Sequence, residues 1–187
     1  MKNIILASQS PRRKQLLDLL DIEFTVEVRE IDEVFPENLE VTEVAEYLAK
    51  LKASVFKDIT DEQLIITADT VVVLDKQILG KPKSKSEAKN ILQSLSNRSH
   101  QVITGVCIKS SDRTLSFSNT TKVYFKKLSD SEIDYYIDNY KPYDKAGAYG
   151  IQEWIGGIGI TKIEGSYFNV VGLPIQELNE KLRQVLH

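Results

Sequence analysis

The run from Leu64 to Leu74 constrains the fold more strongly than any other segment of the sequence. It is apolar along almost its whole length and rich in β-branched side chains, which disfavour a helix and are typical of a strand buried on both faces. Asp75 and Lys76 follow it as a turn. A strand covered on both faces needs helices against it, and the flanking sequence has to supply them.

Helical and extended patterns alternate along the chain, which predicts the α/β class, with a mixed, twisted sheet flanked by helices. Thr42 is expected to cap the second helix, and the capping box Ser129–Glu132 to begin the fourth. There is no repeat, low-complexity tract or linker, so residues 1–187 are expected to form a single domain, at most two-lobed. Strands are expected at 4–7, 64–74, 101–109, 115–125, 158–163 and 167–171, and helices at 11–20, 44–55, 86–95, 130–140 and after Pro174.

Composition excludes several classes of protein. The net charge is 24 − 27 = −3 and the basic residues form no stripe, so a nucleic-acid partner is not expected. Cys107 is the only cysteine and His100 the only histidine before the terminus, which excludes a disulfide scaffold and a structural zinc site. The apolar run Ile4–Ala7 is too short for a signal peptide or a membrane span. A cytoplasmic protein without membrane contact is therefore expected.

The start of the first helix carries an unusual concentration of positive charge. Ser10 is a natural N-cap and Pro11 suits the first helical position, which places Arg12 and Arg13 in the first turn. The helix macrodipole and its free N–H groups already favour an anion there, so two cations indicate a phosphate site. The Ser8 and Ser10 hydroxyls could donate to the same anion. The alternative is two solvated surface arginines beside an ordinary cap.

Asp69 lies in the middle of the apolar strand, where an unpaired carboxylate would be costly. It must meet a cation, a hydrogen-bond donor or a metal, or point into a cleft. Buried carboxylates with such partners concentrate at functional sites, although a strand residue at a sheet edge could also face water. Thr70 would point to the opposite side of a regular strand, where a packed threonine is the simpler interpretation.

Two lysines lie where a functional side chain could be positioned. Lys52 follows Leu48 by four residues, beside the apolar face of its helix, where a lysine usually extends its ammonium group to water. Lys81 lies in the stiff tripeptide Gly80–Pro82, directly after the central strand and its turn. The glycine spacing of a P-loop is missing, so this tripeptide alone is a weak signal.

Two further segments carry polar side chains that could bind a ligand. Gln152 ends the glycine-punctuated loop that begins at Asp144, and its amide could read the edge of a base or simply satisfy backbone groups. Glu30, Asp32 and Glu33 form an acidic cluster that could hold Mg²⁺ or could be a solvated strand end.

Seven of these segments together resemble the Maf family, the septum-formation-inhibitor-like nucleotide pyrophosphatases. They run in family order along nearly the whole chain: Ala7–Arg13, Lys52–Ala53, Thr67–Val72, Leu79–Pro82, His100–Gly105, Asp144–Gln152 and Asn169–Pro174. The resemblance implies an inosine-triphosphatase-like arrangement with a central cleft, and a homodimer. It also implies hydrolysis of a nucleoside triphosphate to the monophosphate and pyrophosphate with a divalent metal, Mg²⁺ or Mn²⁺.

The loop Asp144–Gln152 resembles the branch of the family that acts on dTTP and UTP, in a house-cleaning role that could extend to modified pyrimidine nucleotides. By that resemblance each motif residue receives a role. Asp69 is the proton acceptor, Lys52 and Lys81 are catalytic and hold phosphates, Ser8 and Arg13 bind phosphate, Arg12, Thr70 and Gln152 set substrate choice, and Glu33 helps to place metal or water.

The sequence departs from the family pattern at Asn97, where glycine is expected, at Lys141, where an acidic residue is common, and at Glu153, where glycine often follows the glutamine. Other classes of function stay open. A nucleotide-binding regulator of septum formation and cell division with little catalysis fits the family's name. A phosphatase that removes only the terminal phosphate would use the same anion site.

Overall fold

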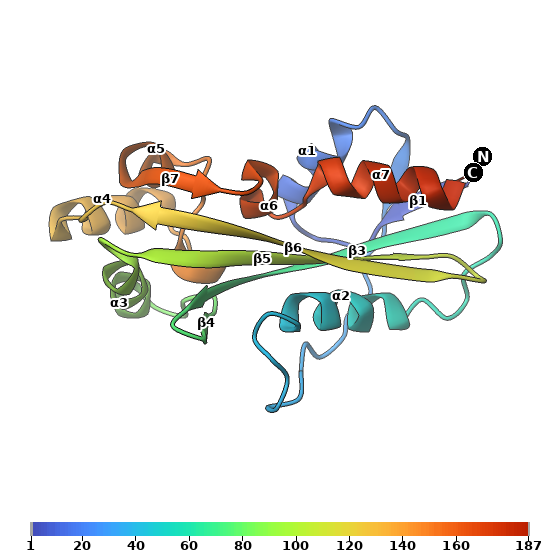
Figure 1. Cartoon of the computed structure of the whole chain (residues 1–187), viewed down its shortest axis with the longest axis horizontal. Coiled ribbons are helices and arrows are strands. Elements are labelled where there is room, and N and C mark those ends of the chain that lie inside the picture. The colour runs from blue at the N-terminus through green and yellow to red at the C-terminus, as the bar shows by residue number, and fades with distance from the viewer. Residues whose placement is uncertain (1, 187) are drawn as a thin grey trace. The chain divides into compact units, whose positions relative to one another are not determined.

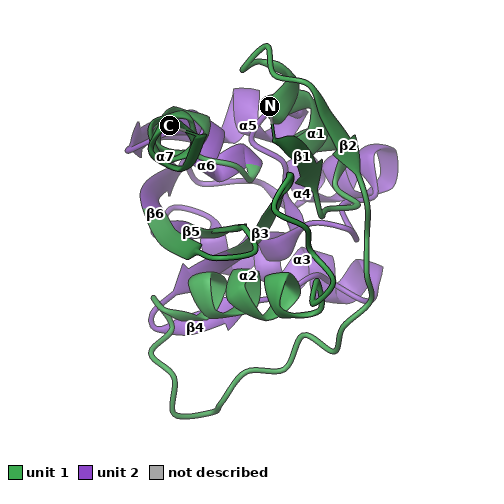
Figure 2. Cartoon of the chain, turned by 90° about the vertical axis from the view of Figure 1, so that its right-hand side faces the viewer, with its two compact units in different colours: residues 1–70, 104–119, 172–187 green, residues 71–103, 120–171 purple. Residues whose placement is uncertain are grey.

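The computed structural model describes residues 2–186, which form two compact units (Figure 2). Of the described residues, unit 1 contains 2–70, 104–119 and 172–186, and unit 2 contains 71–103 and 120–171. No helix among residues 2–186 is long and apolar enough to cross a membrane.

Within residues 2–186, seven strands form one mixed sheet in the order β2-β1-β3-β5-β6-β7, with β4 paired to β3 (Figure 1). Strands β1 and β3 are parallel, with Ile5 opposite Ile65, whereas β3 and β4 form an antiparallel pair with Val73 opposite Ile78. The α/β class with a mixed sheet flanked by helices is thus confirmed. The strands are β1 (Asn3–Leu6), β2 (Phe24–Val26), β3 (Gln63–Leu74), β4 (Gln77–Leu79), β5 (Ser99–Lys109), β6 (Thr114–Phe125) and β7 (Ile160–Glu164).

Unit 1 places helices against both faces of its strands (Figure 1). Its helices are α1 (Pro11–Asp18), α2 (Val44–Ser54) and α7 (Ile175–Leu186). Helix α2 buries Val44, Ala45 and Leu48, and it lies so close to β5 that a Cβ on Gly105 would come within 2.2 Å of the Glu46 backbone. Glycine is required there because any side chain would push the helix away from the sheet.

Unit 2 has its own core under helices α3 (Lys85–Leu95), α4 (Asp130–Tyr140) and α5 (Trp154–Gly159). The predicted capping box is present at the start of α4, where the Ser129 hydroxyl accepts from the Glu132 N–H and the Glu132 carboxylate accepts from the Ser129 N–H. A single 3₁₀ turn (Ala146–Ala148) and the short helix α6 (Tyr167–Val171) complete the unit.

Three predictions about local structure are wrong. Residues 167–171 form helix α6 instead of a strand, because the buried amide of Asn169 donates to Val102 O and Thr121 Oγ1, and these tertiary bonds outweigh the β-branched composition. The strand expected at 158–163 begins only at Ile160, since α5 runs to Gly159. The N-cap of α2 is Glu43 rather than Thr42, and its side chain makes no capping bond.

Candidate active site

The loop between β1 and α1 forms a polar turn followed by a cationic helix start, as the sequence predicts. Ser10 caps α1, because its Oγ accepts from the Arg13 N–H at 3.4 Å, and Pro11 occupies the first turn. The Ser8 hydroxyl, 8% exposed, accepts from the Ser10 N–H at 3.2 Å. With no acidic residue in its first turn, the positive end of α1 carries only Arg12 and Arg13.

The Arg13 guanidinium is built into unit 1. Its Nε donates to Gly172 O at 2.8 Å, Nη1 to Ala68 O at 2.8 Å and Nη2 to Thr70 Oγ1 at 3.0 Å. Burial lowers the pKa of Arg13 from its ordinary value, the charge of Asp69 opposes that change, and the neighbouring Arg12 adds to it. Three of the five N–H donors therefore stabilise the protein itself, and phosphate binding by Arg13 stays a prediction.

Thr70 links Arg13 to the next strand, because its Oγ1 also lies 2.9 Å from Thr104 Oγ1 on β5. Gly172 has a φ of +130°, which disfavours any residue with a side chain. Hydrogen bonds to the Arg13 guanidinium and the Thr104 hydroxyl hold the Thr70 hydroxyl in a fixed position. The role of Thr70 in substrate choice stays a prediction.

Asp69 meets a cation, as its place in an apolar strand requires. Its side chain is 12% exposed, and Oδ1 lies 2.5 Å from the Nζ of Lys52, which is 18% exposed. Two residues earlier on β3, the Thr67 hydroxyl donates to Ala49 O at 2.6 Å. Thr67 and Asp69 therefore both face α2, as the two-residue period of a strand demands. Lys52 turns its ammonium group toward this strand instead of toward water.

Glu33 completes a cluster of three charged side chains. Its Oε1 lies 3.0 Å from Lys52 Nζ, so that one ammonium group contacts two carboxylates from different segments. Glu33 is half exposed, at 49%, while Asp69 is nearly buried. We call Glu33, Lys52 and Asp69 the carboxylate–lysine cluster.

The donor set of this cluster fits a divalent metal that arrives with a triphosphate. Among residues 2–186 there is no group of three or more His, Cys, Asp or Glu side chains that could hold a metal ion on its own. Mg²⁺ usually takes one or two carboxylates and completes its shell with waters and substrate phosphates. Asp69 and Glu33 supply two carboxylates. Because both contact the ammonium group of Lys52, they lie close enough together to contact one small cation.

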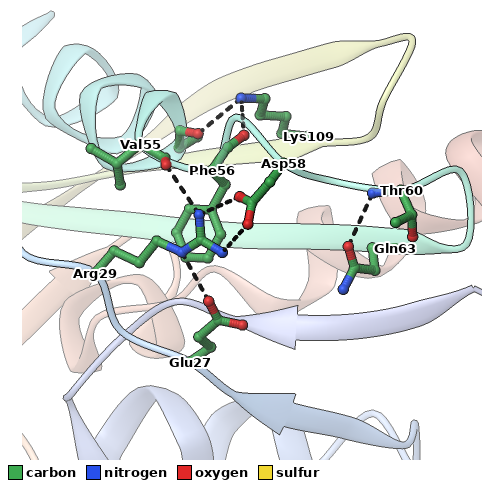
Figure 3. Close-up of polar contacts among 9 residues, drawn as sticks. Glu27, Arg29, Val55, Phe56, Asp58, Thr60, Gln63 and Lys109 are labelled. Carbon is green, nitrogen blue, oxygen red and sulfur yellow. Dashed lines mark hydrogen bonds and ion pairs between the residues drawn. The ribbon is translucent and has the colours of Figure 1, made fainter.

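A second network, which the sequence does not reveal, fixes the end of the helix that carries Lys52 (Figure 3). Arg29 donates to both carboxylate oxygens of Asp58 and to Val55 O, and its guanidinium lies 4.3 Å from the centre of the Phe56 ring. Lys109 donates to Phe56 O at 2.6 Å. Cations at these positions satisfy the carbonyl groups that a helix C-terminus leaves unpaired.

This network also positions the segment that leads to Glu33. Arg29 belongs to that segment and donates to Glu27 Oε1 at 2.8 Å within it (Figure 3). The bonds to Asp58 lower the pKa of that carboxyl and keep it charged. Because residues 27–36 contain no helix or strand, side-chain anchors of this kind have to hold them in place.

Unit 2 carries the two remaining predicted site residues, and both are exposed. Lys81 follows Gly80, whose carbonyl oxygen accepts from the Gly147 N–H at 3.2 Å. The loop with Lys81 is thus tied to the loop that ends in Gln152. Gly147 has a φ of +70°, and a Cβ there would lie 2.9 Å from the Val72 side chain, so this contact requires glycine.

The predicted site residues thus fall into two sets, each described within its own unit. In unit 1, side-chain contacts join Arg13 to Thr70 and Lys52 to both Asp69 and Glu33, and the charge of Asp69 acts on Arg13. Ser8 and Arg12 belong to the same unit, in the loop before α1 and in its first turn. Lys81 and Gln152 lie on neighbouring loops of unit 2.

Comparisons with known proteins give a consistent result. A family model described as "Maf-like protein" matches residues 3–185. A dTTP/UTP pyrophosphatase of Flavobacterium psychrophilum is 54% identical over 176 residues, which cover 94% of this chain and 90% of that protein. A protein of the same name from Christiangramia forsetii is 49% identical, with coverage of 98% and 94%, and one from Parabacteroides distasonis is 51% identical, with coverage of 96% and 94%.

Two solved structures show a weaker likeness. A HAM1 protein from Coxiella burnetii aligns with a TM-score of 0.46 and 17% identity, over 68% of this chain and 75% of that one. The Staphylococcus aureus Ham1 protein aligns with a TM-score of 0.45 and 16% identity, over 66% and 72%. Nothing about activity follows from similarities of this size.

Proposed function

The chain belongs to the Maf family, and from that membership we propose that it is a nucleoside triphosphate pyrophosphatase that hydrolyses dTTP and UTP to the monophosphate and pyrophosphate. Relatives about 50% identical over nearly the whole chain carry the name dTTP/UTP pyrophosphatase, which supports this substrate class. The observation that carries the proposal is the carboxylate–lysine cluster, because it combines a nearly buried carboxylate with a cation beside the cationic start of α1.

Hydrolysis at the α-phosphorus requires a base for the attacking water. Asp69 accepts the proton as the water oxygen bonds to the α-phosphorus, and the bond from that phosphorus to the bridging oxygen breaks, releasing pyrophosphate. Lys52 holds the Asp69 carboxylate in place through its 2.5 Å contact. Such fixed geometry removes the entropic cost of bringing the base to the water.

Positive charge has to stabilise the triphosphate and the departing pyrophosphate. We assign this role to Arg12, Lys52 and Lys81, with a hydrogen bond from the Ser8 hydroxyl beside the positive end of α1. Arg13 contributes by orienting Thr70 through its 3.0 Å hydrogen bond, in addition to any phosphate contact.

Glu33 would hold Mg²⁺ or Mn²⁺ together with the phosphate oxygens of the substrate, next to Asp69, which contacts the same lysine. When bound, the metal supplies Lewis-acid stabilisation of the phosphate charge. All the other contacts of the site come from the chain's own side chains.

Gln152 is the proposed reader of the pyrimidine. Uracil and thymine present an N–H donor flanked by carbonyl oxygens, and one glutamine amide matches this pattern with two hydrogen bonds.

The proposal extends to a cytoplasmic homodimer that removes unwanted pyrimidine nucleotides from the pool.

A nucleotide panel tests the proposal. The protein is incubated with Mg²⁺ or Mn²⁺ and dTTP, UTP, CTP, ATP, GTP or 7-methyl-GTP, and phosphate is assayed with and without inorganic pyrophosphatase. Signal from dTTP and UTP that depends on the added enzyme supports the proposal. Protection against melting by these nucleotides without any product would instead favour the nucleotide-binding regulator, and phosphate without the added enzyme a terminal phosphatase.

A further inference from the structure

The carboxylate of Glu153 lies at the centre of a polar network in unit 2 that the proposed mechanism does not use. Its Oε2 accepts a short hydrogen bond from the Tyr136 hydroxyl on α4, and its Oε1 lies 3.1 Å from Lys145 Nζ. Tyr136 is fully buried and Lys145 is 8% exposed. An ion pair at this depth costs desolvation, so it specifies a conformation more than it adds stability.

This network ties together three points of the loop that carries Gln152. Lys145 lies near its beginning and Glu153 directly after its end, and the Tyr136 hydroxyl accepts from the Gly150 N–H at 3.0 Å. A Cβ on Gly150 would lie 2.8 Å from Glu153 Cδ, so the glycine lets the carboxylate pack against the loop backbone. Burial and the Glu153 contact raise the pKa of Tyr136, which keeps its hydroxyl protonated as a donor.

Gln152 itself is exposed, and both of its flanks are held. Gly150 is fixed two residues before it and Glu153 one residue after it, each through Tyr136. An amide can pair with uracil in one orientation and, turned over, with cytosine, because it carries both a donor and an acceptor. Selection for uracil therefore requires the glutamine to stay in one place and one orientation.

We propose that Glu153 is a specificity-determining positioning residue, which holds Gln152 through Tyr136 and Lys145 so that the site selects uracil or thymine over cytosine. The inference rests on the proposed function, because it takes Gln152 as the reader of the base. It gives a role to a glutamate at a position where the resemblance leads us to expect glycine.

The test compares binding and hydrolysis in matched variants. Affinities for the non-hydrolysable α,β-methylene analogues of UTP and CTP are measured by calorimetry, and turnover of UTP and CTP is measured in parallel. Glu153→Ala should lower the preference for the UTP analogue about tenfold, close to the effect of Gln152→Ala, and should act mainly on KM for UTP. Glu164→Ala, which removes an exposed carboxylate paired with Lys162 in the same unit, is the control and should change neither.

A second variant keeps the inference testable if Glu153→Ala does not fold. Lys145→Met breaks the ion pairs of Lys145 with Glu153 and with Asp144 but keeps the bond between Glu153 and Tyr136, so a smaller loss of preference, about threefold, is expected. Unchanged UTP preference in both variants, with folding confirmed by melting, would overturn the inference. Selective binding of the UTP analogue by the wild type that is lost in Glu153→Ala, without hydrolysis of UTP by either, would contradict the proposed function and support the inference. Equal binding of both analogues by the wild type would overturn the inference.

Discussion

The ammonium group of Lys52 lies 2.5 Å from the carboxylate of Asp69, so the last turn of α2 neutralises a charge in the middle of an apolar strand. The same ammonium lies 3.0 Å from Glu33. Helix, strand and loop thus meet in one charged cluster, and removing Lys52 would leave the nearly buried Asp69 carboxylate without the cation that it contacts.

Asp69→Asn should abolish nucleotide hydrolysis without unfolding the protein. Asparagine keeps an oxygen that can accept from Lys52 but cannot take a proton from water, so turnover of UTP should fall by about 10²–10⁴-fold. Steady-state kinetics checks the rate, and a thermal melt checks the fold. Full activity in this variant would remove Asp69 from the mechanism.

Arg13→Lys should destabilise the protein by about 1–3 kcal/mol, because one ammonium cannot serve the acceptors on Gly172, Ala68 and Thr70 that the planar guanidinium reaches at once. Urea unfolding measures the change. Lys14→Arg, one position along α1 and exposed, is the control and should leave the midpoint where it is. Equal stability of the wild type and Arg13→Lys would show that these three bonds contribute nothing.

His100 should make the protein less stable in acid. Burial lowers its pKa from 6.5 to about 4. Between pH 6.5 and pH 4, His100 is therefore protonated in the unfolded chain and neutral in the folded one. Stability from this group is fully present above pH 6.5 and falls by about 1.4 kcal/mol per pH unit down to pH 4. Urea unfolding should be measured for the wild type and for His100→Gln at pH 7 and pH 5. The unfolding free energy of the wild type minus that of the variant should be about 2 kcal/mol smaller at pH 5 than at pH 7. Parallel curves would contradict the assignment.

Lys141→Gly should stabilise the protein by about 0.5–1 kcal/mol. Lys141 ends α4 with a φ of 46°, a left-handed conformation that glycine adopts without strain. Asn97→Gly is the matched comparison, since Asn97 has a φ of 58° but asparagine tolerates this region, and a smaller gain is expected. Chemical denaturation measures both. A loss of stability in Lys141→Gly would mean that the lysine side chain outweighs the backbone strain.

Strong local signals account for what the sequence could predict. The β-branched run forms β3, and the capping box lies at the start of α4. Asp69, a carboxylate among apolar neighbours, is expected to need a partner, and it contacts Lys52. In each case a single residue or a short pattern carries a large local free energy. Tertiary context does not have to be known.

The misses depend on contacts between distant segments. Helix α6 forms because the Asn169 amide donates hydrogen bonds to Val102 O and Thr121 Oγ1, and no local sequence pattern predicts these bonds. Arg29 anchors the segment before Glu33 through Asp58, which lies 29 residues away in the chain. Glu153 is a different case. The sequence shows it as a departure from the family pattern, in which glycine often follows the glutamine, but its partners Tyr136 and Lys145 are visible only in the structure.

Hydrolysis of UTP in H₂¹⁸O with Mg²⁺ tests the central claim most directly. Attack of water at the α-phosphorus puts the heavy oxygen into UMP and leaves pyrophosphate unlabelled, which mass spectrometry of the products reads out. The account predicts labelled UMP with unlabelled pyrophosphate. Label in pyrophosphate, or labelled inorganic phosphate beside UDP, would contradict it.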